Sequence, residues 1–181
     1  DGTAWPSPDY DDSAWSTGRA TFAWETTPST LAFLQATAPT NTLLEPPEGR
    51  TDYFRAHFTW SGSTAGAVLI LSNAVDDGAV IYLNGVEQER IRLLDGVPDV
   101  WGSLTTDTTP GGDVAAWEAI TLGGSNLVTG DNLLAVSVHQ HSEISSDVVF
   151  GMIVLGIQPF APVIADPGQP GDAVVRQGRK H

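Results

Sequence analysis

The sequence contains no cysteine, which excludes disulfide bonds, zinc–thiolate centres and cysteine nucleophiles. It also lacks any run of about 18 apolar residues, the length that a helix needs to cross a bilayer. With 181 residues, 41% of them hydrophobic, the chain is long enough to bury a sizeable core without such support. This length suits one sandwich or barrel domain with a tail better than two domains.

Basic residues are scarce, since eight Lys and Arg stand against 22 Asp and Glu, and Lys180 is the only lysine. The formal net charge of −14 repels phosphate backbones and anionic membrane surfaces. We therefore expect no nucleic-acid partner and no membrane insertion. Divalent cations, neutral glycans and proteins with basic patches stay compatible with this surface, which can also serve solubility alone.

Composition divides the chain into three regions. Residues 1–49 are rich in Pro, Thr, Ser and Trp, and residues 50–157 carry most of the alternating apolar pattern. Residues 158–181 contain four prolines and three glycines, which is typical of an extended linker or arm. We expect one folded domain over residues 1–157 and an extended docking arm or linker over 158–181.

Alternating apolar residues predict strands in the middle region. In residues 53–60, Phe54, Phe58 and Trp60 fall on one face. Between residues 79–83 and 86–90, Asn84-Gly85 predicts a type I′ hairpin, because both turn residues of that type need positive φ. Further strands are expected over residues 67–71, 117–122, 133–139 and 148–157. No window shows helical periodicity with caps, so the pattern predicts an all-β sandwich or barrel.

Four motifs follow one another along the chain. They are DDSAWSTG at 11–18, YFR at 53–55, DDGAVIYLNGVE at 76–87 and TGDNLLAV at 129–136. In these motifs, over about residues 5–157, the chain resembles galactose-binding-like jelly rolls, including the sugar-binding modules attached to glycoside hydrolases. The resemblance implies an antiparallel jelly-roll β-sandwich in a secreted, extracellular protein, although fold alone does not fix function. Residues 26–48 depart from the family pattern as an insertion at the mouth of any binding site.

Asp76 and Asp77 directly precede the predicted hairpin. Adjacent carboxylates on a tight loop can chelate Ca²⁺, which takes six to eight oxygen ligands. The paired aspartates are similar to the calcium-dependent sugar site of yeast flocculin domains, and this resemblance implies a Ca²⁺ ion that coordinates sugar hydroxyls. The alternative is an ordinary Asp-Gly turn whose carboxylates accept local backbone N–H groups. Residues 11–13 offer the same two interpretations, a loop cap or a structural Ca²⁺ site.

Asn84, Arg90 and Trp101 are the further candidate ligand-binding residues. A tryptophan exposed in a loop suits stacking on a sugar ring, because it combines apolar area with a polar group. The alternative for Trp101, as for Trp15, is that it plugs an end of the sandwich.

His139 and His141 fall on one face of a predicted strand, with Glu143 and Asp147 nearby. A transition-metal site needs three or four convergent ligands, and the alternative is a core histidine that ends the strand. Nucleophile-elbow, phosphate-loop and His-Glu-x-x-His motifs are all missing from the sequence, and we expect no catalysis.

These patterns lead to two functional hypotheses. The first is a non-catalytic extracellular module that binds carbohydrate or mediates adhesion, with Ca²⁺ as its candidate cofactor. The alternative is a structural subunit of an extracellular assembly, in which residues 158–181 join one copy to the next as a homo-oligomer.

Overall fold

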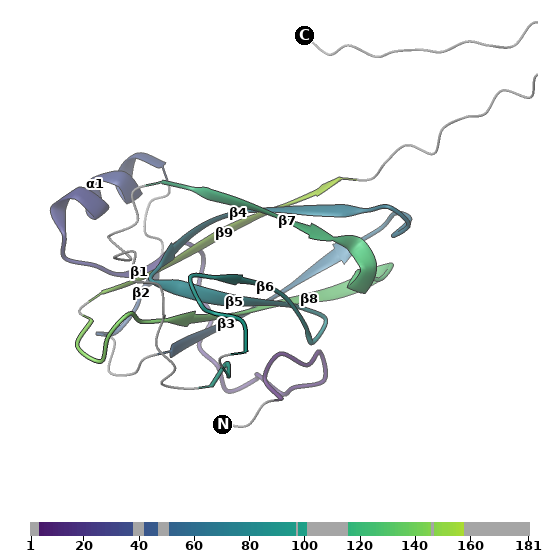
Figure 1. Cartoon of the computed structure of the whole chain (residues 1–181), viewed down its shortest axis with the longest axis horizontal. Helices are drawn as coiled ribbons and strands as arrows, with labels where there is room; N and C mark the ends of the chain where they lie inside the picture. Colours follow the sequence, from purple (N-terminus) through teal and green to yellow (C-terminus); the bar gives the residue numbers. More distant parts are fainter. Residues whose placement is uncertain are drawn as a thin grey trace, which may run out of the picture.

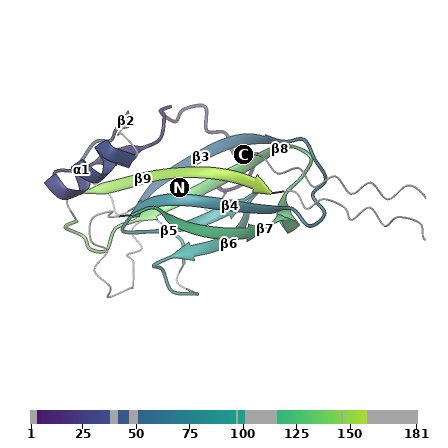
Figure 2. The ribbon, with the colours of Figure 1, turned by 90° about the horizontal axis from the view of Figure 1, so that it is seen from above.

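The computed structural model describes residues 4–37, 42–46, 51–96, 98–100, 116–145 and 147–157. In this part of the chain two β-sheets face each other as a sandwich (Figures 1 and 2), so the expected all-β sandwich is confirmed. Trp101 and the arm 158–181 lie outside the described residues, and the expectations for them stay predictions. Among the described helices none has the length and apolar character to cross a bilayer.

The first sheet has five strands in the order β2-β1-β9-β4-β7. Their bounds are β1 Phe22–Trp24, β2 Thr42–Leu43, β4 Val68–Asp76, β7 Glu118–Gly123 and β9 Val148–Ile157. β1 and β2 run parallel, whereas the other strand pairs that the structure describes are antiparallel, as the sandwich prediction expected. Parallel neighbours need a crossover connection, and the helix α1, Pro28–Thr37, supplies it.

The second sheet has four antiparallel strands in the order β3-β8-β5-β6. Their bounds are β3 Thr51–Trp60, β5 Gly78–Leu83, β6 Val86–Ile91 and β8 Gly130–His139. A short 3₁₀ turn, η1, spans Gly124–Asn126 before β8. Asn84 and Gly85 have φ values of 52° and 83°, which confirms the predicted hairpin turn.

The helix α1 contradicts the expectation that the chain has no helix. Only Thr30 and Leu34 are buried in it, so its apolar stripe is too narrow to give a helical pattern in the sequence. Contacts outside the helix hold it in place. The Glu25 carboxylate accepts the N–H groups of Thr26 and Thr27 just before its first turn. On the outer face of the first sheet, Leu34 packs in a small cluster with Ala23, Ala74 and Val149.

The main core lies between the two sheets. It is built from the inward-facing residues of the strands, among them Leu69, Leu71, Ile81, Val136 and Val138, all nearly or fully buried. The aromatic rings of Phe54 and Phe150 stack across the sandwich with centroids 4.4 Å apart. This core reaches from β3 to β9, and burying each such aliphatic side chain stabilises the fold by about 1.5–3 kcal/mol.

The N-terminal segment, residues 4–16, packs on the outer face of the second sheet, on the side where the N-terminus is marked in Figure 1. Trp5 is buried there, with ring centroids 4.7 Å from Tyr53 and 5.4 Å from Tyr82. The segment therefore closes a second, smaller core with Leu133 and Ala135 of β8.

Arg55 of β3 anchors this segment. Its side chain is only 2% exposed, and its Nε atom donates to Asp12 Oδ2 at 2.7 Å. The other guanidinium N–H groups donate to three backbone carbonyls of the segment, those of Trp5, Ser7 and Tyr10. Arg55 thus satisfies groups from four residues that form no strand of their own.

Replacing Arg55 by alanine should lower the free energy of unfolding by about 3 kcal/mol, because it leaves buried carbonyl oxygens without a donor. Urea denaturation followed by tryptophan fluorescence measures this change. Arg19→Ala is the matched control, since Arg19 is exposed, and its effect should stay within about 0.5 kcal/mol. Equal denaturation midpoints for the two variants would contradict the anchoring role.

Candidate functional site

Three carboxylates meet on the outer face of the first sheet, and we call Glu25, Asp76 and Asp147 the acidic cluster. One oxygen from each lies within 4.8 Å of the others. The fold brings them together because Glu25 follows β1, Asp147 precedes β9 and Asp76 ends β4, and these strands are adjacent in the sheet. The cluster therefore lies at the end of α1 that Glu25 contacts.

The acidic cluster is strongly unfavourable for three negative charges. Burial raises the pKa of Asp76 to about 9, with further contributions from the charges of Asp77, Asp147 and Glu25. Asp76 is 3% exposed. Its Oδ2 atom and Glu25 Oε2 are buried without a hydrogen-bond partner among the described residues, as is the hydroxyl of Thr30 in the first turn of α1. Two buried, unpartnered carboxylate oxygens face a local excess of negative charge.

The donor set of the acidic cluster fits a hard divalent cation. Ca²⁺ prefers carboxylate, carbonyl and hydroxyl oxygens in flexible geometry. The three carboxylates could hold such an ion. It would neutralise the charge that raises the pKa of Asp76 and would give partners to Glu25 Oε2 and Asp76 Oδ2.

Of the two aspartates expected to bind calcium, the structure places only Asp76 in the acidic cluster. Asp77 is 4% exposed and its carboxylate accepts the backbone N–H of His141 at 2.6 Å. Its carbonyl accepts the Nε–H of Arg92. Asp77 therefore holds the β4–β5 turn against the loop after β8 through a long-range hydrogen bond, whereas the interpretation as an Asp-Gly turn expected local ones.

A cavity of about 800 Å³ opens between β3 and the β1–β2 pair, where the edges of the two sheets face each other. We call it the edge cavity. Its aromatic lining residues are Trp15, Phe22, Tyr53 and Phe54, and its acidic ones are Asp12, Glu45 and Asp52. Aliphatic side chains of β8 and β9 complete the lining, including Val136, Met152 and Val154.

The N-terminal segment and β2 form the rim of the edge cavity. The hydroxyl of Thr42 accepts the N–H of Arg19 and donates to its carbonyl, each at 2.9 Å. Gly18 lies so close that a Cβ atom there would be 2.7 Å from Thr42 Oγ1 and from the ring of Phe22. A side chain at the glycine that ends the DDSAWSTG motif would therefore force the side chains of Thr42 and Phe22 to shift.

Asn84 lies at the opposite end of β5 from Asp76 and Asp77, roughly 20 Å away along a six-residue strand. Its Nδ2 donates to Asn126 O and Asn132 Oδ1, and its Oδ1 accepts the N–H of Leu133, all at 2.8 Å. The structure therefore does not bring Asn84 together with the paired aspartates, and its amide fixes the hairpin to β8.

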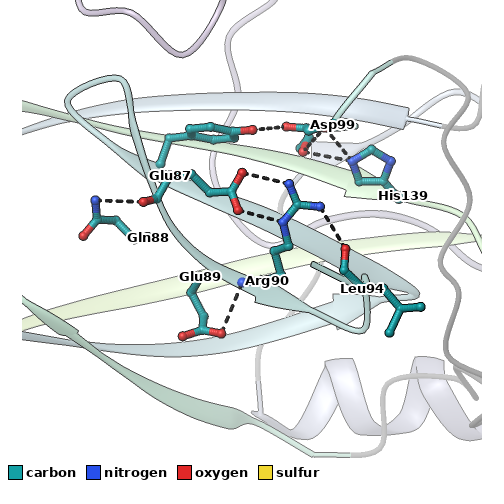
Figure 3. Close-up of polar contacts among 9 residues, drawn as sticks. Glu87, Gln88, Glu89, Arg90, Leu94, Asp99 and His139 are labelled. Carbon is teal, nitrogen blue, oxygen red and sulfur yellow. Dashed lines mark hydrogen bonds and ion pairs between the residues drawn. The ribbon is translucent and has the colours of Figure 1, made fainter. Parts of the chain in front are cut away.

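The Arg90 side chain contacts a residue of its own edge strand, β6, and a residue of the loop that follows this strand. Figure 3 shows its guanidinium bound by both carboxylate oxygens of Glu87, at 2.7 and 2.8 Å, and donating to Leu94 O at 3.3 Å. The hydrogen bond with Glu87 raises the pKa of Arg90. This bidentate ion pair stabilises β6 and the loop that follows it.

His139 is fully buried and forms part of a polar network on the second sheet (Figure 3). Its Nε2 lies 2.9 Å from Asp99 Oδ1 and its Nδ1 lies 3.2 Å from Thr51 Oγ1. Burial disfavours the charge of Asp99, but hydrogen bonds from His139, Tyr82 and Ser137 outweigh it and lower its pKa. Both ring nitrogens are thus engaged, which agrees with the core alternative for His139 and not with a metal site shared with His141.

The sequence alone did not identify Glu25 or the Asp147–Asp76 pairing. It also did not identify Asp52 as a site residue. Glu25 and Asp147 are distant in sequence from Asp76, and only the pairing of β1, β9 and β4 joins them. Asp52 did carry a signal, because it occupies an inward position of β3 in line with Phe54 and Phe58. In residues 11–13, Asp11 Oδ1 accepts the N–H of Ser13 at 3.0 Å, the kind of contact that the cap interpretation expects.

Comparison with known proteins finds no matching family model and no matching curated protein. Among solved structures, the chain is similar to part of a glycosyl hydrolase family 2 member from Bacteroides cellulosilyticus, at 18% identity and a TM-score of 0.44 over 81% of this chain and 18% of that chain. It is also similar to part of Bacteroides uniformis β-glucuronidase 2, at 17% identity and a TM-score of 0.46 over 83% of this chain and 16% of that one. A third similar structure is part of a β-glycosidase from Bacteroides vulgatus, at 14% identity and a TM-score of 0.41 over 84% of this chain and 18% of that one. The chain therefore spans less than a fifth of the length of each of these proteins.

Proposed function

We propose that this chain is a non-catalytic carbohydrate-binding module of a secreted protein, with a glycan as its partner in the edge cavity. The observation that carries the proposal is the make-up of that cavity. Its volume of about 800 Å³ lies in the range of small-molecule sites. Aromatic faces for stacking on sugar rings stand beside carboxylates that accept sugar hydroxyls, and the chain resembles sugar-binding jelly rolls in its motifs.

Binding without catalysis is supported by the state of the acidic residues in the edge cavity. Asp12 is already paired with Arg55 at 2.7 Å. No histidine is among the described lining residues, so the hydroxyls of Ser16 and Thr17 have no histidine base beside them in this part of the chain. Among its described lining residues, the cavity therefore offers recognition groups and no hydroxyl nucleophile with a histidine base.

We propose Ca²⁺ as the ion of the acidic cluster, with a supporting role and no contact to the sugar. Phe22 of β1 lines the edge cavity, and Trp24 packs on the core between the sheets. Side chains alternate along a strand, so Glu25 turns to the opposite, outer face. An ion bound there would fix the end of β1, and with it the wall of the cavity. This differs from the flocculin-like arrangement, in which the metal coordinates the sugar directly.

Isothermal titration against a panel of soluble oligosaccharides should detect binding, and Trp15→Ala should weaken it by about fivefold or more. The reason is that Trp15 lies on the cavity lining, where losing a stacked aromatic face costs about 1 kcal/mol or more. Leu94→Ala is the control, because Leu94 is 61% exposed and is not among the cavity residues. If no glycan of the panel binds, or if both variants bind alike, the proposed function is wrong.

In metal-free protein, Asp76→Asn should be more stable than the wild type at neutral pH. The pKa of Asp76 is about 9 in the folded protein and about 4 in an unfolded chain. Folded wild type therefore binds the proton more tightly and loses stability as pH rises through that window. Thermal unfolding after chelation measures the stability of both proteins. The difference in stability should disappear as the pH falls to about 4.

Adding Ca²⁺ should stabilise the wild type and narrow this difference. At a concentration 100 times Kd, binding stabilises the folded state by about 2.7 kcal/mol, or roughly 5–10 °C in Tm for a domain of this size. Asp76→Asn should lose most of that increase, and Asp95→Asn, an exposed control, should keep it. The same Ca²⁺-dependent increase in all three proteins would contradict a calcium ion in the acidic cluster.

A further inference from the structure

The edge cavity contains a carboxylate without a partner. Asp52 lies on β3, and its side chain shares the inner face of the strand with Phe54 and Ala56. Among the residues that the structure describes, its carboxylate makes no hydrogen bond and no ion pair. Burial raises the pKa of Asp52, and no other group contributes to that shift. A half-buried carboxylate in apolar surroundings lowers stability unless a partner arrives from outside.

The other charged residues of the edge cavity do not supply that partner. Arg55 is its one cationic residue among those described, and its donors are used by Asp12 and the backbone of the N-terminal segment. Glu45, on the β2 side, is exposed and adds a second negative charge. With Arg55 and Asp12 balancing each other, the cavity keeps the charge of Asp52 and Glu45.

The walls of the edge cavity favour a cation as well. Trp15, Phe22, Tyr53 and Phe54 are all among its lining residues. Aromatic faces carry negative electrostatic potential and attract ammonium groups, most strongly where water is excluded. The net charge of −14 on the whole chain acts in the same direction at longer range.

We propose that the edge cavity selects sugars that carry a protonated amino group, and that Asp52 accepts the ammonium of such an amino sugar. This inference rests on the proposed function, since it names the class of glycan that the module takes. The sugar ring would stack on the aromatic walls while its ammonium forms a charge-assisted hydrogen bond with Asp52. A neutral N-acetylated sugar would leave Asp52 facing only an amide or hydroxyls.

The test compares a glucosamine tetramer with an N-acetylglucosamine tetramer of the same linkage, by isothermal titration at mildly acidic pH, where the amine is charged. Wild type should bind the glucosamine tetramer about 10–100-fold more tightly, the range expected of a hydrogen bond between charged groups. Asp52→Asn should lose that preference and bind both tetramers alike. Glu89→Gln, the same change of charge on the opposite edge strand β6, should bind as wild type.

A second measurement separates recognition from folding. Asp52→Asn removes a half-buried charge without a partner, so its Tm near neutral pH should equal or exceed that of wild type. A lower Tm would assign Asp52 a structural role and overturn the inference.

Three binding outcomes would also overturn the inference. Equal affinity of wild type for both tetramers would leave the module a binder of neutral sugars, with the proposed function intact. Tighter binding of an oligolysine peptide than of the glucosamine tetramer would make the ligand a basic peptide. Binding of no glycan at all would remove the proposed function together with the inference.

Discussion

The central strands of both sheets are buried on both faces over part of their length, and the rest of the structure depends on covering both of those faces. On β8, each residue from 132 to 139 is buried, and on β4 each residue from 73 to 76. Such strands need cover on the outer face as well as a facing sheet. The N-terminal segment covers the second sheet through Trp5, and α1 covers part of the first sheet through Leu34. Each cover is short and is fixed by one charged side chain, Arg55 for the segment and Glu25 for the helix.

Both candidate sites lie where one of these covers ends. The acidic cluster is at the start of α1, and the edge cavity is beside residues 12–18 of the N-terminal segment. At these margins the fold leaves polar groups without partners among the described residues, namely the carboxylate of Asp52 and single oxygens of Glu25 and Asp76. Leaving such groups unpaired costs stability. Natural proteins keep costs of this kind chiefly where they serve function.

The sequence predicts the strands well where one face is apolar or a turn residue is decisive. β3 and the β5–β6 hairpin follow from period-two alternation and from Asn84-Gly85, because those signals are local. α1 could not be predicted, since Leu34 is its only buried apolar residue and its stability comes from contacts with the sheet. Asp76 was identified from its neighbour Asp77, yet the carboxylates beside it belong to Glu25, just after β1, and Asp147, just before β9, and only long-range strand pairing brings these together.

The short strand β1 connects the two candidate sites. Phe22 contributes to the edge cavity, and Glu25, three residues later, belongs to the acidic cluster on the other face of the sheet. Only Phe22–Trp24 pair with β9, so the position of this wall depends on few hydrogen bonds. A cation that binds Glu25, Asp76 and Asp147 would tie the end of β1 to β4 and β9, and would reduce the motion that a sugar must otherwise restrain. Such coupling is reciprocal: whatever factor the cation adds to sugar affinity, the sugar adds to cation affinity. In the proposed function, the cation needs no contact with the sugar in order to affect its binding, because Glu25 directly follows the strand that carries Phe22.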